Sequence, residues 1–100
     1  MTAYEFLEPA QIELEKEVKY YNAQQAELGY DFANEVADAI ARMLRYPEAW
    51  TKISKRTRRC RTKRFPYGVI SQIRGDRILI VAVGHLRRKP FYWRDRVKMV

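Results

Sequence analysis

The feature that most constrains the fold is an unbroken run of six apolar residues at positions 78–83. Arg74-Gly75-Asp76 comes shortly before the run and predicts a tight hairpin turn. A strand of continuous apolar character is typical of the centre of a sheet. We therefore expect residues 77–83 to form a central strand, with residues 67–73 as its antiparallel neighbour.

The N-terminal residues predict a short edge strand followed by a helix. Tyr4 and Phe6 alternate with Glu5 over residues 2–8, and Pro9 closes the segment. From there to about residue 27, apolar residues recur at helical spacing among charged ones. The sequence predicts one amphipathic helix in this segment, with Gly29 as its C-cap.

A second helix is predicted from Asp31, as its N-cap, to Pro47. Its apolar residues follow a strict i, i+4 series of Phe32, Val36, Ile40 and Leu44. Only a few residues join the two helices, so we expect an antiparallel hairpin with one apolar face. The acidic residues Asp31, Glu35 and Asp38 share a face that we interpret as solvated.

The segment after Trp50 is predicted to be a connector, and residues 57–65 a cationic strand ended by Pro66. Alternation places Arg59, Arg61 and Lys63 on one face and Arg58, Cys60, Thr62 and Arg64 on the other. The predicted order is β-α-α-β-β-β. The fold class is therefore α+β, a small, mainly antiparallel sheet with a helical hairpin on one face, in a single domain of residues 1–100.

The charge of the chain is strongly segregated. Residues 1–50 hold four Lys/Arg against ten Asp/Glu, whereas residues 51–100 hold sixteen against two. The halves therefore carry net charges of −6 and +14, which add up to the overall +8. A cationic face attracts phosphate polymers and acidic protein segments alike, so nucleic acid or an acidic partner is favoured over a neutral small molecule.

Composition excludes several classes of site. Cys60 is the only cysteine and His85 the only histidine, so an internal disulfide and a structural zinc site are excluded and we expect no metal or other cofactor. The basic half has only Asp76 and Asp95, which excludes a nuclease with carboxylate-bound metal. No export or membrane segment is evident, so we expect a cytoplasmic protein.

The segment 84–96 follows the central strand and carries the candidate chemistry. Histidine is the side chain that ordinarily exchanges a proton near neutral pH. RNA cleavage needs a base, an acid and cations around the phosphorus, and His85, Arg88 and Tyr92, with Arg87, could supply these without metal. The alternative is a histidine simply held by a hydrogen bond. Phe91 and Trp93 are interpreted as packing residues, with Tyr92 in solvent.

The candidate substrate-binding residues are cations along the basic half. In the functional interpretation their side chains meet phosphates. In the alternative they keep an edge strand from aggregating. The candidates are Lys52, Lys55, Arg59, Arg61, Lys63, Arg64, Arg87 and Lys89.

Over nearly its whole length the chain resembles the RelE/ParE superfamily of bacterial type II toxin–antitoxin toxins. The resemblance rests on four segments whose order and spacing match: Leu28-Gly29-x-x-Phe32-x-x-Glu35-Val36, Pro47-x-x-Trp50, Arg64-Phe65-Pro66-Tyr67 and Ala82-Val83-Gly84-His85-Leu86-Arg87-Arg88-Lys89-Pro90-x-Tyr92-Trp93. It implies the same β-α-α-β-β-β order and a cytoplasmic growth inhibitor held inactive by a cognate antitoxin.

The resemblance implies two alternative targets. RelE-like members cut mRNA on the ribosome, and Tyr92 and Arg88 match positions of that branch, whereas Gly68 and Leu86 stand where its arginines are usual. ParE-like members poison DNA gyrase without being nucleases. The favoured hypothesis is ribosome-dependent, metal-free mRNA cleavage, with the gyrase poison as the alternative. A third is a non-toxic paralogue that only binds nucleic acid or an antitoxin.

Overall fold

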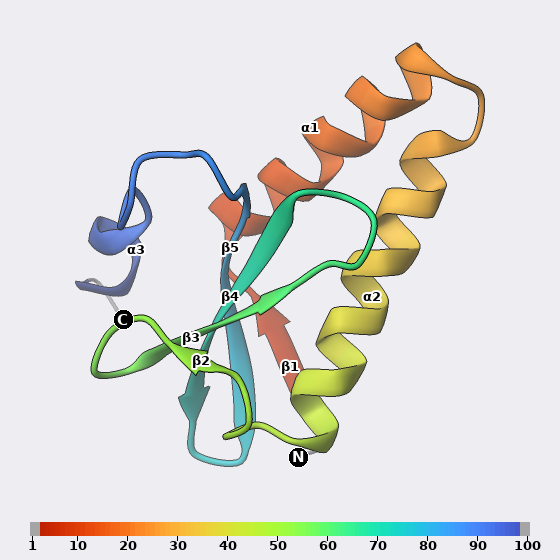
Figure 1. Ribbon diagram of the computed structural model, residues 1–100. Helices are drawn as coiled ribbons and strands as arrows, with labels where there is room; N and C mark the ends of the chain where they lie inside the picture. The colour runs from red at the N-terminus through yellow and green to blue at the C-terminus, as the bar shows by residue number, and fades with distance from the viewer. Residues whose placement is uncertain (1–2, 99–100) are drawn as a thin grey trace.

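Figure 1 shows the computed structural model, which describes residues 3–98 as a five-stranded sheet with a helical hairpin on one face. The predicted α+β class and the β-α-α-β-β-β order are confirmed. Two short elements add to that order: a strand within the expected connector and a helix after the aromatic residues. The elements are β1 (Ala3–Phe6), α1 (Glu8–Gln24), α2 (Leu28–Arg45), β2 (Thr51–Lys52), β3 (Thr57–Arg61), β4 (Tyr67–Arg74), β5 (Arg77–His85) and α3 (Arg94–Lys98).

The sheet has the strand order β1-β5-β4-β3-β2. The apolar run 78–83 lies in β5, where all six residues are buried, so its predicted internal position is confirmed. β1 runs parallel to β5 and pairs with it only as far as Phe6↔Ile80, while the other neighbours are antiparallel. Gly75 adopts φ 59° in the turn between β4 and β5, a conformation that glycine tolerates without strain.

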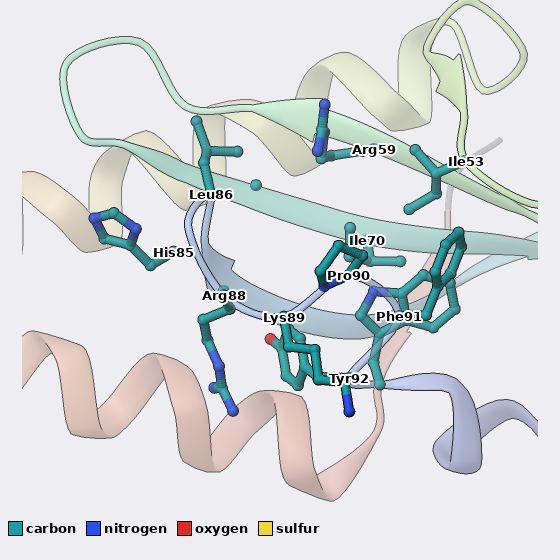
Figure 2. Close-up of a pocket in the computed structure, with 13 residues that line it drawn as sticks. Ile53, Arg59, Ile70, His85, Leu86, Arg88, Lys89, Pro90, Phe91 and Tyr92 are labelled. Carbon is teal, nitrogen blue, oxygen red and sulfur yellow. The ribbon is translucent and has the colours of Figure 1, made fainter.

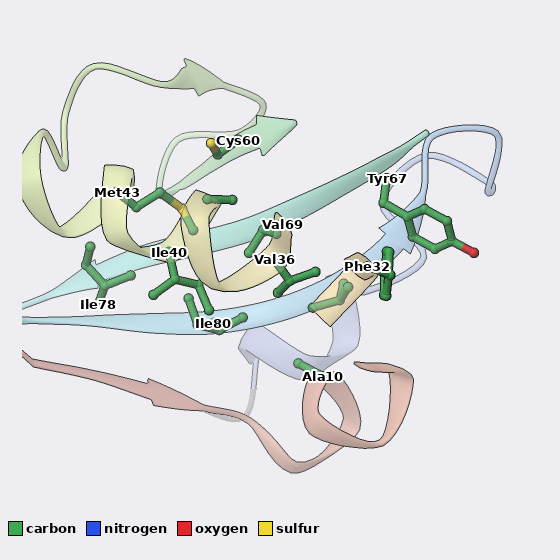
Figure 3. Packing of buried hydrophobic residues seen from close by; sticks show 12 residues of the cluster. Ala10, Phe32, Val36, Ile40, Met43, Cys60, Tyr67, Val69, Ile78 and Ile80 are labelled. Atoms are coloured by element: carbon green, nitrogen blue, oxygen red, sulfur yellow. The ribbon is translucent and has the colours of Figure 1, made fainter. Parts of the chain in front are cut away.

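The main core lies between the sheet and the helical hairpin (Figure 3). Phe32, Val36 and Ile40 come from the predicted i, i+4 stripe of α2, and they pack toward Val69 and Ile80 of the sheet. Each such side chain contributes about 1.5–3 kcal/mol when it leaves water. The amphipathic stripe of α2 is therefore what fixes the hairpin to this face.

Gly29 joins the two helices but is not a C-cap. It is the second residue of α2, and a Cβ there would lie 2.1 Å from the carbonyl oxygen of Val18 in α1. The Gly29 N–H donates to Asn22 Oδ1 at 2.8 Å. The left-handed residue of the turn is Glu27, with φ 67°. Glycine is needed here because the helices approach closely, so the prediction had the right residue type and the wrong role.

The expected cationic strand 57–65 ends early, at Arg61. Residues 62–66 instead form a turn held by α2. Glu35 accepts the backbone N–H groups of Lys63 and Arg64 at 2.9 and 2.8 Å, and the Arg64 Nε at 2.6 Å. Burial opposes ionisation of Glu35, but these hydrogen bonds prevail and lower its pKa. The interpretation of Glu35 as part of a solvated face is therefore wrong.

A second cluster covers the opposite face of the sheet. Trp93, 4% exposed, packs with Ile70, Leu79 and Val81 on that face. Figure 1 shows α3 on the side of the sheet away from the helical hairpin. The C-terminal segment is thus a small covering layer of its own.

Candidate functional site

The candidate site lies where β5 loses its neighbouring strand. Because β1 ends at Phe6, no strand within residues 3–98 lies beside the edge of β5 beyond Ile80. Side chains take that place: Val83 N–H donates to Glu13 Oε1 at 3.0 Å, and Arg96 Nη1 donates to the Val81 carbonyl at 3.1 Å. Glu13 of α1 and Arg96 of α3 therefore seal the open edge.

Glu13 is the centre of this arrangement, and we call Glu13, Arg88, Tyr92 and Arg96 the Glu13 cluster. Its side chain is 12% exposed, and its carboxylate accepts hydrogen bonds from Arg96 Nη1 and Nη2 at 2.8 and 3.0 Å. Arg88 Nη1 lies 3.2 Å and the Tyr92 hydroxyl 2.8 Å from Oε2. The hydrogen bond to Glu13 raises the pKa of Arg96. The cluster holds the C-terminal segment against α1.

Tyr92 is half-buried in the Glu13 cluster, contrary to the prediction that it lies in solvent. Burial and the Glu13 carboxylate raise the pKa of its phenol. The Arg88 guanidinium stacks on its ring at 3.8 Å. A Cβ on Gly84 would lie 2.2 Å from the Tyr92 hydroxyl, so the phenol rests directly on the backbone of β5. This geometry suits a structural hydrogen bond better than proton abstraction.

His85, at the end of β5, is held by its own loop. Its Nδ1 accepts the Arg87 N–H at 3.0 Å, and its ring packs edge-on against Tyr67 at 5.2 Å between centroids. In Figure 2 Arg88 extends toward α1, whereas the imidazole lies beyond the strand end. His85, Arg88 and Tyr92 are thus brought to one end of β5, but only Arg88 and Tyr92 share a hydrogen-bonding partner among the contacts described.

A cavity of about 160 Å³ lies beside these residues, on the sheet face opposite the helical hairpin. We call it the β5-end pocket. Its lining includes Arg59, Arg88, Lys89 and His85 but no acidic residue. Its other lining residues are Ile53, Gly68, Ile70, Gly84, Leu86, Pro90, Phe91, Tyr92 and Trp93. The Arg59 Nε is buried and has no hydrogen-bonding partner in the part of the chain that the structure describes.

Of the two aromatic residues that were predicted to pack, Phe91 and Trp93, only one is buried. Trp93 is buried, as expected of a packing residue. Phe91 was expected to pack too, but it is 40% exposed and has φ 61°, an unusual conformation for a bulky side chain. Its ring lies 5.7 Å from that of Trp93. Phe91 therefore stands at the surface beside the β5-end pocket.

The candidate substrate-binding cations do not form one surface. Arg59 and Lys89 line the β5-end pocket, while Lys63 and Arg64 are paired with Asp38 and Glu35 of α2 at 3.7 and 2.6 Å. Those two residues are therefore already paired with acidic side chains of α2. The remaining candidates are exposed cations outside the pocket: Lys52, Lys55, Arg61 and Arg87.

Residues 3–98 include neither a membrane-spanning helix nor a cluster of metal ligands. No helix in this range is long and apolar enough to cross a membrane. Across the same residues, no group of three or more His, Cys, Asp or Glu side chains could hold a metal ion. Cys60 is buried, which raises the pKa of its thiol.

Comparison with known proteins identifies the family. The sequence model described as "ParE toxin of type II toxin-antitoxin system, parDE" matches residues 4–90. The structure is similar to a chain of the chromosomal ParDE system from P. aeruginosa, with a TM-score of 0.74 and 12% identity, over 85% of this chain and 96% of that one. A comparison with curated proteins finds no match. On the family match, the chain belongs to the ParE toxin family of type II toxin–antitoxin systems.

Proposed function

We propose that this chain is the toxin of a type II toxin–antitoxin module, and that it arrests growth by binding DNA gyrase rather than by cutting RNA. The observation that carries the proposal is the ParE family match over residues 4–90. In this proposal the protein is cytoplasmic and is kept inactive by a cognate antitoxin. The charge of its C-terminal half suits contact with an acidic partner.

The geometry of Tyr92 and Arg88 supports a mechanism without RNA cleavage. A tyrosine that acts as a base must give up its proton, yet burial and Glu13 raise the pKa of Tyr92. Arg88 already contacts the same carboxylate, so its charge is partly compensated. In this proposal the contacts of both residues with Glu13 serve to attach the C-terminal segment to α1.

One observation favours mRNA cleavage as a second candidate. A Cβ on Gly68 would lie 2.8 and 3.0 Å from the Arg59 side-chain carbons, so the Arg59 stem covers the position where the ribonuclease branch usually has an arginine. Arg59 also lines the pocket that His85 lines. A guanidinium from β3 could therefore serve in place of one from position 68.

The antitoxin proposal is supported by an apolar groove between β1 and α2. β1 is an edge strand, so one side of its backbone is free to pair with an added strand. The groove beside it is lined mainly by small or apolar residues, namely Tyr4, Phe6, Leu14, Ala33, Val36, Ala37, Ile40, Ala41 and Leu44. A partner tail with an apolar face would fit this groove, and acidic residues in the same tail would suit the cationic half of the chain.

Induction of the protein alone in a bacterium tests the proposal. We expect growth arrest with trapped double-strand breaks in supercoiled plasmid and intact mRNA. Cuts within codons of ribosome-bound mRNA would instead support the second candidate. Normal growth of cells that contain folded protein would contradict both toxin hypotheses and favour the non-toxic paralogue.

A further inference from the structure

The β5-end pocket combines a cationic side chain that lacks a partner with an apolar interior. Arg59 has no ion pair among the described residues, and its buried Nε has no hydrogen-bonding partner. A guanidinium without an acidic partner is costly to bury, and an anion in the pocket would pair with its charge. Within residues 3–98 no acidic residue lines the pocket, so an anion that pairs with Arg59 there would come from another molecule.

The pocket's size and lining restrict the rest of the ligand. A cavity of about 160 Å³ is close to the size that holds one benzene ring. Ile70, Leu86 and Trp93 provide apolar walls. Among residues 3–98 the pocket lining offers a nucleobase hydrogen-bond donors but no amide or carboxyl side chain, and its one hydroxyl, on Tyr92, is bonded to Glu13. An apolar side chain needs no such partners.

Phe91 adds an exposed contact at the same place. Its positive φ of 61° is costly for a bulky residue, and such strain often marks a functional site. The ring is 40% exposed, lies 5.7 Å from that of Trp93 and has the Arg94 guanidinium 5.2 Å from its centroid. Exposed aromatic residues next to cations are frequent anchors in protein–protein interfaces.

We propose that the β5-end pocket binds a large apolar side chain of the antitoxin that has an Asp or Glu next to it, with the carboxylate paired to Arg59. This inference rests on the proposed antitoxin partner and adds a contact on the face opposite the helical hairpin. The net charge of +14 in residues 51–100 attracts an anionic partner, and the apolar walls of the pocket favour a protein segment over a phosphate polymer.

The test is an NMR titration of the full chain with the peptide acetyl-Asp-Phe-Glu-amide. We expect the largest shifts at the amides of Gly68, Gly84 and Leu86 and at the Trp93 indole. Acetyl-Asn-Phe-Gln-amide and acetyl-Asp-Ala-Glu-amide should each bind about tenfold more weakly. The first lacks the carboxylates, and the second lacks the large apolar side chain. Adenosine monophosphate should bind more weakly than the first peptide.

Two substitutions on β3 separate the pocket from general charge attraction. Arg59→Gln should weaken binding of acetyl-Asp-Phe-Glu-amide about tenfold. Arg61→Gln, an equal loss of charge at an exposed site outside the pocket, should change it by about twofold at most. Spectra of the variants without peptide show whether they fold. If Arg59→Gln does not fold, the wild-type shift map and the relative affinities of the three peptides still test the proposal.

The proposal would be overturned if the peptide did not bind or if it shifted only signals from other surfaces. It would also be overturned if the two variants lost equal affinity for the peptide, or if adenosine monophosphate bound more tightly than the peptide. The titration does not depend on toxicity. If the protein arrests growth but does not bind the peptide, only the proposed role of the β5-end pocket is refuted. If it binds the peptide but does not affect growth, only the proposed toxin function is refuted.

Discussion

Tyr92 donates its hydroxyl proton to Glu13 Oε2 at 2.8 Å, a contact between residues 79 positions apart in the chain. The same carboxylate binds Arg88, Arg96 and the Val83 N–H. A tyrosine that could pass for a catalytic group is therefore part of the attachment of the C-terminal segment to α1.

Glu13→Ala should lower the free energy of unfolding by about 3 kcal/mol, because it leaves Arg96 partly buried without its carboxylate. Glu15→Ala is the matched control on the same helix. Glu15 is exposed and accepts a hydrogen bond from Gln11, so its loss should cost no more than about 0.5 kcal/mol. Urea unfolding measures both variants, and equal losses would show that the Glu13 cluster does not stabilise the fold.

The double change His85→Ala with Tyr92→Phe should leave growth inhibition intact. Tyr92→Phe removes one hydrogen bond at Glu13 and should cost about 1 kcal/mol of stability, while Arg96 keeps the segment attached. The measurement is growth after induction, at matched amounts of folded protein. Abolished toxicity in a folded variant would restore the catalytic role of these two residues.

Gly84→Ala should dislodge Tyr92 from the Glu13 cluster, because the new Cβ would meet its hydroxyl at 2.2 Å. Overpacking of this kind costs about 1–3 kcal/mol. Gly75→Asn is the control, since Asn tolerates a positive φ and position 75 has open space around it. Thermal unfolding should show a clear loss for the first variant and little for the second. A Gly84→Ala protein as stable as wild type would contradict the close contact.

Stability should fall in acid partly through Glu35. Its folded pKa lies below the ordinary value of 4.5, so its contribution is full above that value and is lost as the pH falls through the folded pKa. Glu35→Gln should cost about 1 kcal/mol at pH 7, after allowance for solvent screening. We expect the difference from wild type to shrink below about pH 4. A difference that stays constant with pH would contradict the carboxylate's role.

The fold could be predicted from sequence because its determinants are local. The i, i+4 stripe of α2 and the apolar run of β5 each follow from residues close together in the chain. Boundaries were less predictable where tertiary contact decides them. Gly29 has its role because α1 passes close by, and β3 ends at Arg61 where Glu35 of α2 binds the following turn.

The candidate site was predictable in place but not in its contacts. The pattern around residues 84–96 pointed to the correct end of β5, yet nothing near Glu13 in the sequence marks it as the partner of Tyr92. That pairing depends on β1 ending at Phe6 and leaving the edge of β5 open. Lys63 and Arg64 likewise looked like free cations because their acidic partners lie on α2.

The most direct measurement of the central claim is a gyrase supercoiling assay with the purified protein, run beside a ribosome-bound mRNA cleavage assay. We predict that the wild-type chain and the His85→Ala, Tyr92→Phe variant both inhibit gyrase and that neither cuts mRNA. Unimpaired gyrase, together with mRNA cuts that disappear in the variant, would contradict the account.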